Sequence, residues 1–473
     1  MGCNPFVHEL LLLTLLWQLV ISYWIWKQSH APKHPPAPQP KRLPKILKPF
    51  TGLTQKPHCE MCEQSPEHSD PPPLSPPPVI TSKRGRPRTV ATHQHYCPEK
   101  TCPYYGWVGR GNIHANGHPG RSPWRQLQCV VCQTYFLETQ GTVFHGKRVP
   151  AELLVRVVAA LAEGVGLRAV ARVFEVDPNP VLQWVGEVAD QLQAFSHYWL
   201  HDLPIGQVQL DELFAVLSAV QVGEGREAET LERRSHSPHW GWVALDPVSK
   251  LLLSIDVGER SLAMAQRLVH HAGQVLAPGC IPLFLTDGFR EYTTAILTHF
   301  GRWVQPPRHT LSGPGPKPRW MPLPELLYAQ VVKQYRRRGL VGMRHRVVFG
   351  TWACLMHGLA PRGWHINTAF VERVNLTIRH HVAAVGRRVL TLCKSAGGLR
   401  HQTILYHTYY NFCLLHASLR VPLAHPQPTN GSGSVKKWQL RTPAMAARLT
   451  DHVWSVRQVL VFRVPPWPQP QGL

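Results

Sequence analysis

The spacing of apolar and polar positions changes several times along the chain, and each change predicts a different kind of element. "GQVQLDELFAV" predicts a strand, and "WGWVALDP" with "SKLLLSIDVG" predicts a hairpin beside it. "SLAMAQRLVHHAGQVL" has the period of an amphipathic helix. "IPLFLTD" is continuously apolar, as a parallel strand covered on both faces must be. This order predicts an α/β domain, to which we assign residues 204–420.

Two further elements complete the predicted domain. "ELLYAQVVKQY" predicts a fifth strand. "NTAFVERVNLTIRHHVAAVGRR" predicts a helix whose apolar stripe consists of Val371, Val374, Ile378, Val382 and Val385. The stripe leaves Glu372, Asn375 and Arg379 on a shared neighbouring face. The order strand, hairpin, helix, strand, helix, strand, helix is that of the ribonuclease H fold.

Three acids are candidates for chemistry at the edge of this sheet. Asp211 lies in the first strand, and Asp287 follows the fourth, at the carboxyl end where open α/β sheets place ligands. Glu372 would join them from the last helix. Converging carboxylates repel one another, and divalent cations relieve that repulsion. Two cations roughly 3.5–4 Å apart can promote phosphoryl transfer. We therefore expect Asp211, Asp287 and Glu372 to bind Mg²⁺ (or Mn²⁺).

Other acids of the same region are weaker candidates. Asp246 and Asp256 fall at turn or hairpin positions, where aspartate is common for backbone reasons. Glu212 adjoins Asp211, and strand alternation predicts that it points to the opposite face of the sheet. For Glu372 the alternative is a surface acid that balances neighbouring arginines.

The stretch 148–201 contains three successive apolar stripes of helical period, separated by Gly164–Gly166 and by "VDPNP". This pattern of three short helices predicts a helix-turn-helix whose third helix would enter the major groove of DNA. A plain helical spacer is the alternative, because three short helices are common in proteins.

Most of the eleven cysteines lie in short-spaced pairs, which in a reducing compartment indicates metal binding. In the segment 93–140, "CPEKTC" and "CVVC" supply two pairs that predict a zinc ribbon with four sulfur ligands, Cys97, Cys102, Cys129 and Cys132. Such a site has no open position, so the Zn²⁺ would be structural. Cys59 and Cys62 form a further pair, which the sequence leaves open as half of a metal site.

Positive charge is in large excess. Lys and Arg number 51 against 28 Asp and Glu, for a formal net charge of +23, so a polyanion is the expected partner. Residues 29–92 are Pro-rich and basic, and we expect a disordered linker there. Within it, "KRGRPR" resembles the AT-hook, which implies minor-groove contacts by Lys83, Arg84, Arg86 and Arg88. A generic basic linker is the alternative.

The first 28 residues form a separate hydrophobic segment. Residues 10–26 carry no charge and are just long enough to span a bilayer. We favour a membrane contact through residues 10–26 less than the alternatives. A buried oligomerisation helix, or a start codon assigned too far upstream, would explain the segment equally. Residues 421–473 are expected to be a C-terminal tail.

The stretch "VERVNLTIRHHVAAVGRRVLTLCKS" combines an acid, an Asn three residues later, Arg pairs and Lys-Ser. It resembles the catalytic-glutamate block of DDE transposases of the bacterial insertion-sequence-one family, and the similarity covers about Cys97 to Leu419. By this resemblance Asp211, Asp287 and Glu372 match the metal-binding acids. The resemblance also places five residues near DNA: Asn375, Arg379, Arg387, Arg388 and Lys394.

Two features depart from the compact family members. Asp287 and Glu372 are 85 residues apart, with a Pro-rich and basic insertion between them. The hydrophobic opening and the long linker are also additional. The insertion carries arginines that would grip phosphate or form a solvated basic surface: Arg336, Arg337, Arg338, Arg344 and Arg346.

The sequence therefore predicts a transposase that binds terminal inverted repeats in double-stranded DNA and then cuts and joins strands with Mg²⁺. Joining two ends implies a homo-oligomer, and the resemblance implies a prokaryotic cytoplasm with the protein at the nucleoid. Two alternatives remain open. One is a transposase-derived DNA-binding regulator with an inactive core, and the other is a membrane-attached nucleic-acid-binding protein.

Overall fold

The computed structural model describes residues 77–80, 92–215, 239–307, 315–337, 339–385, 393–428 and 433–466, all within one compact unit from Pro72 to Leu473. Several predicted features lie outside these residues: the hydrophobic segment 10–26, Cys59, Cys62, the "KRGRPR" residues, Arg338, Arg387 and Arg388. No helix in the described ranges combines the length and apolarity that a membrane span requires.

The first described layer is a small antiparallel sheet of order β1-β2-β3. It consists of β1 (Ile113–Ala115), β2 (Gln126–Cys129) and β3 (Tyr135–Leu137). Its core is made by apolar residues together with the cysteines themselves, since Leu127 and Cys129 are both fully buried. A core this small depends on a staple such as a metal.

Three helices follow, as the sequence pattern predicted: α2 (Ala151–Ala162), α3 (Leu167–Val173) and α4 (Pro178–Trp199). The Asp177 side chain caps α4 by accepting a hydrogen bond from the Asn179 amide across 2.8 Å. Gly164, with φ +86°, lies directly after α2, where a Cβ would come within 2.5 Å of the His380 carbonyl oxygen. Only glycine fits a position that combines this backbone angle with so close an approach.

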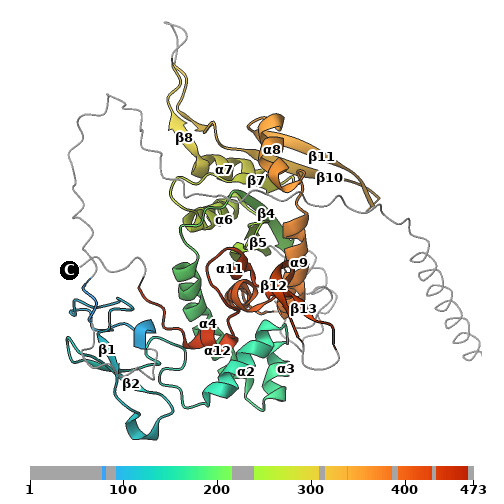
Figure 1. Ribbon diagram of the computed structural model, residues 1–473. Coiled ribbons are helices and arrows are strands. Elements are labelled where there is room, and N and C mark those ends of the chain that lie inside the picture. Colours follow the sequence, from blue (N-terminus) through green and yellow to red (C-terminus); the bar gives the residue numbers. More distant parts are fainter. Residues whose placement is uncertain are drawn as a thin grey trace, which may run out of the picture. The chain divides into compact units, whose positions relative to one another are not determined.

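The centre of the molecule is a six-stranded mixed sheet of order β11-β10-β7-β4-β5-β6 (Figure 1). Its strands are β4 (Gln207–Phe214), β5 (Trp240–Leu245), β6 (Leu252–Gly258), β7 (Leu283–Thr286), β10 (Tyr328–Arg336) and β11 (Gly339–Phe349). β7 runs parallel to β4 on one side and to β10 on the other, and the remaining pairs are antiparallel. This confirms the predicted α/β sheet and is compatible with a ribonuclease H-like core.

Helices cover both faces of the sheet. On one face, α6 (Leu262–Val275) and α7 (Glu291–Phe300) pack on residues such as Trp242 and Phe284. On the other, α8 (Trp352–Leu359), α9 (Ala369–His381) and α10 (Ala396–Thr408) pack on residues such as Val243 and Leu285. α10 also packs along α4, where the hydroxyls of Ser196 and Thr408 lie 3.1 Å apart. The helical segment and the sheet therefore share one core.

Helix α9 is shorter than its apolar stripe predicted. It ends at His381, yet Val382 and Val385 are both buried in the next turn. The apolar spacing continues past the helix end because the following backbone, Ala383–Val385, packs on the same cluster as a 3₁₀ turn. The spacing of buried apolar residues alone does not distinguish a continuing α-helix from a 3₁₀ turn.

The insertion and the C-terminal region both form ordered structure. The insertion holds the ribbon of β8 (Gly301–Val304) and β9 (Arg319–Pro322), followed by the β10–β11 hairpin. After α10 come β12 (His416–Gln427), β13 (Lys436–Arg441), α11 (Pro443–Ala446) and α12 (Val456–Val461). Trp454 and Leu460 belong to the main core, so part of the stretch expected as a tail is packed.

Candidate active site

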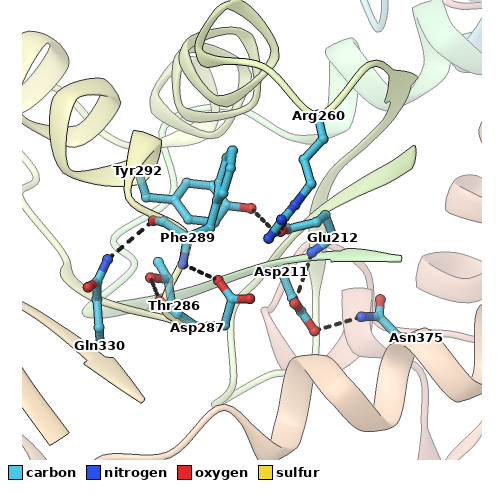
Figure 2. Close-up of polar contacts among 9 residues, drawn as sticks. All are labelled: Asp211, Glu212, Arg260, Thr286, Asp287, Phe289, Tyr292, Gln330 and Asn375. Carbon is cyan, nitrogen blue, oxygen red and sulfur yellow. Dashed lines mark hydrogen bonds and ion pairs between the residues drawn. The ribbon is translucent and has the colours of Figure 1, made fainter. Parts of the chain in front are cut away.

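Three carboxylates meet at the carboxyl ends of the central parallel strands. The pairing of β4 with β7 ends at Leu210 and Thr286, so Asp211 and Asp287 both follow the last paired positions. Together with Glu212, these aspartates form a group whose ligand oxygens all lie within 4.8 Å of one another. Figure 2 shows the three side chains around one small space. The predicted meeting of Asp211 with Asp287 is thus present in the structure.

The Asp211 side chain is held from two sides. The Glu212 amide donates to Asp211 Oδ1 across 2.9 Å, and Asn375 Nδ2 donates to Asp211 Oδ2 across 2.8 Å. Asn375 comes from α9, so the helix fixes the rotamer of a residue on β4 (Figure 2). Asn375 Oδ1 is buried and has no hydrogen-bond partner among the described residues. An unpartnered acceptor beside carboxylates suits a cation or its water.

Asp287 is positioned by the turn that it begins. Its Oδ1 accepts a hydrogen bond from the Phe289 amide across 2.9 Å, as aspartate commonly does at the start of a turn. The preceding Thr286 is fully buried, and its hydroxyl lies 2.9 Å from that of Tyr328 on β10. The strand end beneath Asp287 is therefore rigid.

Glu212 also belongs to the acid group, although it was predicted to point to the opposite face of the sheet. Strand alternation does turn Glu212 toward α7, where Tyr292 Oη donates to its Oε2 across 3.1 Å. Because β7 ends at Thr286, no paired strand separates Glu212 from Asp287. The glutamate side chain is longer than that of aspartate, so the Glu212 carboxylate reaches the group. Arg260 Nε donates to Glu212 Oε1 across 2.7 Å and so offsets one negative charge.

Burial and mutual repulsion shift the titration of this group. Burial, followed by the charges of Asp287 and Glu212, raises the pKa of Asp211 to about 8. Burial also raises the pKa of Asp287, and burial and then the charge of Asp287 raise the pKa of Glu212. Carboxylates that resist ionisation when they are close together gain most from a bound cation.

The predicted third ligand, Glu372, is not a member of this group. Glu372 lies in the first turn of α9, where the Thr368 hydroxyl donates to its Oε1 across 2.6 Å. Lys333 on β10 forms an ion pair with the same oxygen, also at 2.6 Å. The charge of Glu372 nevertheless contributes to raising the pKa values of Asp211 and Asp287. Glu372 therefore lies beside the group, with its negative charge neutralised by Lys333.

The competing acids have structural partners. Asp246 caps the turn after β5, accepting from the Ser249 amide across 3.0 Å. Asp256 lies in β6 and is held by ion pairs with Arg267 and Arg400. Neither residue joins the acid group, as the sequence indicated.

The four predicted zinc ligands also come together. The Sγ atoms of Cys97, Cys102, Cys129 and Cys132 lie within 4.8 Å of one another. Cys97 and Cys132 are 3.5 Å apart at Sγ, and Cys102 and Cys129 are 3.9 Å apart. Four sulfurs at about 2.3 Å from one Zn²⁺ would be separated by about 3.8 Å. The cluster therefore has the size of a tetrahedral zinc site, and Asn112 Nδ2 lies 3.4 Å from Cys129 Sγ as an outer hydrogen-bond donor.

The candidate DNA-binding residues are spread over several elements. Arg336 and Arg337 are exposed at the tip of the β10–β11 hairpin, and Lys394 is exposed directly before α10. Arg379 on α9 is half-buried. Among the described residues predicted to contact DNA, Asn375 touches the acid group directly. Arg260 pairs with Glu212 of the group, and Lys333 pairs with Glu372 beside it. Neither was predicted, because a lone basic residue carries no motif.

Comparisons with known proteins give little. No family model and no curated protein matches the chain. One similar solved structure is described as "Crystal structure of the Mos1 Strand Transfer Complex", at 16% sequence identity and a TM-score of 0.13. The match covers 33% of this chain and 56% of that chain, so it spans only about half of the solved protein. A match with so low a TM-score supports no conclusion about the fold or activity of this chain.

Proposed function

We propose that this chain is a DDE-type transposase that cuts and joins DNA strands with divalent metal ions. The observation that carries the proposal is the position of three carboxylates, with one oxygen of each within 4.8 Å of the others, where the parallel pairing of β4 with β7 ends. The strand order β6-β5-β4-β7-β10 is the order expected of a ribonuclease H-like core. The net charge of +23 supports a polyanionic substrate.

Asp211 and Asp287 would hold the metal ions, with a third carboxylate completing the site. Bound Mg²⁺ would activate water or a 3′-hydroxyl and stabilise the leaving oxygen of the phosphodiester. The chain itself orients the acids, because Asn375 fixes Asp211 and the Phe289 amide fixes Asp287. These contacts keep the two aspartates in place during transfer between phosphodiesters.

We assign the third carboxylate to Glu372, with Glu212 as a supporting anion. Glu372 and Asn375 are three residues apart on α9 and so share a face, with Cβ atoms about 5–6 Å apart. Asn375 already touches Asp211. Lys333 forms an ion pair with Glu372 beside the acid group. If Glu372 is the third ligand, it would exchange Lys333 for a metal ion, and Lys333 would be available to contact the DNA phosphate.

The amino-terminal modules would recognise the element ends. The sulfur cluster would hold a structural Zn²⁺ in a zinc ribbon, and α2, α3 and α4 would form the helix-turn-helix. The exposed Arg336 and Arg337 of the β10–β11 hairpin would contact phosphate. These assignments, together with the domain boundaries, belong to the proposal.

A strand-transfer assay with pre-cleaved element ends and Mg²⁺ tests the chemistry. We expect wild-type protein to join the ends, and Asp287→Asn, which keeps the shape of the side chain, to lower the rate at least a hundredfold. Glu259→Gln, at an exposed acid just after β6, is the control and should retain full activity. Equal rates for wild type and Asp287→Asn would refute the proposed chemistry.

A second pair of variants identifies the third acid. If Glu372 is the ligand, Glu372→Gln should abolish strand transfer, whereas Glu212→Gln should lower it only about tenfold through the changed charge. The reverse order would assign the third position to Glu212 and overturn our assignment of Glu372.

One observation favours a different function, a DNA-binding regulator without catalysis. Both Glu212 and Glu372 already have cationic partners, Arg260 and Lys333, which partly neutralise the acid group without a metal ion. A protein of this kind would bind element ends specifically but would show no Mg²⁺-dependent strand transfer. Measurement of end binding alongside the strand-transfer assay separates the two functions.

A further inference from the structure

Two strands of the insertion form an arm beside the central domain. β8 and β9 make a two-stranded antiparallel sheet of their own, and its described residues are 301–307 and 315–322. We call these residues the β8–β9 arm. Figure 1 places β8 beside α7 and outside the six-stranded sheet. A two-stranded sheet is marginally stable by itself in water, so the arm depends on what it packs against.

The base of the β8–β9 arm is attached firmly to the core. β8 begins at Gly301, directly after the last residue of α7. A Cβ at Gly301 would lie 2.4 Å from the Leu297 carbonyl oxygen and 2.7 Å from that of Met321, so the helix and both strands meet where only glycine fits. Phe300 packs on Phe284 of the main core, with ring centroids 4.9 Å apart. The arm is therefore fixed where it begins.

Beyond its base, the arm exposes large apolar side chains. Trp303 is paired with Trp320 in the register, and directly opposed residues of an antiparallel pair share a face. Trp303 is 59% exposed and Trp320 36%, and their rings meet edge to face with centroids 5.6 Å apart. Met321, on the other face, is 37% exposed, so the described part of the chain leaves both faces open. Two adjacent surface tryptophans indicate a binding surface.

The β8–β9 arm is also positively charged. Arg302, Lys317 and Arg319 are exposed, and none of them forms an ion pair with a described residue. The described residues of the arm include no Asp or Glu, and the first acid after it is Glu325. Helix α7, which packs against the arm, has one acid, Glu291, at its opposite end. An anionic partner complements this surface, whereas a second copy of the same arm would repel it.

A DNA strand with unpaired bases is the anion that matches both features. Aromatic side chains stack on unpaired bases, and basic residues beside them contact the phosphates. In a duplex the bases stack on one another, and the grooves present hydrogen-bonding edges, to which an indole ring offers one N–H donor. The net charge of +23 on the whole chain favours a nucleic acid over an acidic protein segment.

We propose that the β8–β9 arm binds unpaired nucleotides of a DNA strand, whose bases stack on the tryptophan pair and whose phosphates meet the arginines. Trp303, the more exposed ring, offers a free face to one base. The two arginines lie on the other face, Arg302 in β8 and Arg319 in β9. Because the two strands are only about 4.8 Å apart, these long side chains can extend around the edges of the arm toward a strand on the tryptophan face.

One DNA strand is long enough to contact both the arm and the acid group. α7 begins at Glu291, four residues after Asp287, and its ten residues end at the base of the arm. At 1.5 Å per residue the helix is about 15 Å long, or roughly four to five nucleotide steps. That the unpaired strand comes from a cut element end rests on the proposed function, whereas binding of an unpaired strand does not.

Photo-crosslinking on the full chain locates the contact. The probe is a short single-stranded oligothymidine that carries 5-iodouracil, used without Mg²⁺ so that a chain unable to join DNA still gives a readable result. Trypsin cleaves after Arg302 and after Arg319, so Trp303 and Trp320 begin separate peptides that mass spectrometry distinguishes. We expect cross-links to these peptides. Cross-links confined to other parts of the chain would overturn the proposal.

Fluorescence anisotropy with the same strand measures the affinity. Trp303→Leu, which keeps an apolar side chain but removes the ring, should weaken binding at least about fivefold, whereas Trp303→Phe should retain most of the affinity. Trp352→Leu is the matched control, because Trp352 is 52% exposed on α8, outside the arm. Both tryptophans are exposed, so neither change disturbs the core. Equal affinities of Trp303→Leu and wild type would overturn stacking on this ring and the proposal with it.

The phosphate contacts are tested by the salt dependence of binding. The double variant Arg302→Gln and Arg319→Gln should reduce the slope of log affinity against log salt concentration by about 0.7 per arginine, the value for one phosphate contact on a single strand. An unchanged slope would overturn the assignment of the arginines.

Two further measurements exclude other occupants. Trp303→Leu should leave the affinity for a duplex of the same length unchanged, and an equal loss for duplex and single strand would replace the unpaired strand by a groove contact. Size-exclusion chromatography should give the same oligomeric state for Trp303→Leu and wild type. Loss of a dimer in the variant, with its DNA affinity unchanged, would assign the arm to a second copy of the chain and overturn the proposal.

Discussion

Asn375 on α9 donates a hydrogen bond from Nδ2 to Asp211 Oδ2 on β4 across 2.8 Å, linking residues 164 positions apart in the sequence. The contact fixes one carboxylate of the acid group and orients the amide, whose Oδ1 remains buried without a partner among the described residues. Asn375 therefore acts as a positioning residue. It holds Asp211 in place and presents an oxygen beside the same space.

Replacing Asn375 with Leu, which has a similar volume, should weaken the metal site while the fold remains intact. Loss of a hydrogen bond that orients a metal ligand typically lowers metal affinity or activity by about 10–100-fold. We expect a higher Mg²⁺ requirement in strand transfer, measured by Mg²⁺ titration at fixed DNA. Leu376→Ala, at an exposed neighbour on the same helix, is the control. An unchanged Mg²⁺ requirement in Asn375→Leu would contradict the positioning role.

The raised pKa of Asp211 predicts an unusual pH dependence of stability in the absence of divalent cations. The pKa of an aspartate side chain is ordinarily 3.8, and that of Asp211 is about 8 in the folded protein, so the folded state binds more protons than the unfolded state between these pH values. Stability should therefore fall as pH rises from about 4 to about 8, by up to about 1.4 kcal/mol per pH unit from this group. The raised pKa values of Asp287 and Glu212 act in the same direction.

Urea unfolding at pH 6, 7 and 8 measures this dependence. Divalent cations are removed from the buffer beforehand, and no chelator is added. Asp211→Asn should flatten the pH profile, because the amide does not titrate. Added Mg²⁺ should restore wild-type stability at pH 8 and should not restore it in Asp287→Asn. A wild-type profile that rises from pH 6 to pH 8 would contradict the prediction.

Much of the sheet could be predicted from the sequence because its strands are defined by burial. β7 is buried at every position and is apolar at all of them except Thr286, since helices cover it on both faces. β5 and β6 are likewise mostly buried, apolar runs. The end of α9 could not be predicted, because Val382 and Val385 keep the helical spacing after the helix has ended. The helices of the C-terminal region were missed because α11 has only four residues and α12 only six, too few for a helical period to stand out.

The acid group, too, could be predicted only in part from the sequence. Asp287 was predicted because it ends an apolar strand, and Asp211 because the predicted strand order brings its strand beside that one. Glu212 was set aside by strand alternation, which gives the face of a side chain but does not reveal that β7 ends at Thr286 and leaves room for Glu212 to reach Asp287. Lys333 pairs with Glu372 only because β10 lies beside β7 in the sheet, a relationship that spacing along one strand does not encode.

The cysteine cluster predicts a strict dependence of the small sheet on zinc. Cys129 is fully buried and belongs to the core of that sheet. Cys129→Ser should lose one equivalent of bound zinc per chain and unfold the ribbon, because metal binding and folding are coupled in such small domains. Metal analysis after dialysis measures the loss, and specific binding of element ends should weaken in parallel. Cys280→Ser, outside the cluster, is the control. Intact specific binding by Cys129→Ser would contradict a role for the ribbon in end recognition.

A buried arginine predicts that the C-terminal region stabilises the same ribbon. Arg463 is 4% exposed, and its guanidinium lies 3.9 Å from the ring centroid of Tyr96 and 4.8 Å from that of Phe136. Its Nη1 also donates to the Tyr96 carbonyl across 2.9 Å. Arg463→Met should keep the packing but lose these contacts, at a cost of about 1–3 kcal/mol.

Hydrogen exchange measures the effect, because amides near Tyr96 should lose protection before those of the central sheet. Arg457→Met is the matched control, since Arg457 on α12 pairs with Glu152 at the surface and should contribute less than about 1 kcal/mol. Equal protection in Arg463→Met and wild type would contradict this prediction. It would mean that the free energy cost of burying the Arg463 charge equals the stabilisation from its contacts, as happens for some buried ions. The ribbon would then be held by its cysteines and its own small core, without help from the C-terminal region.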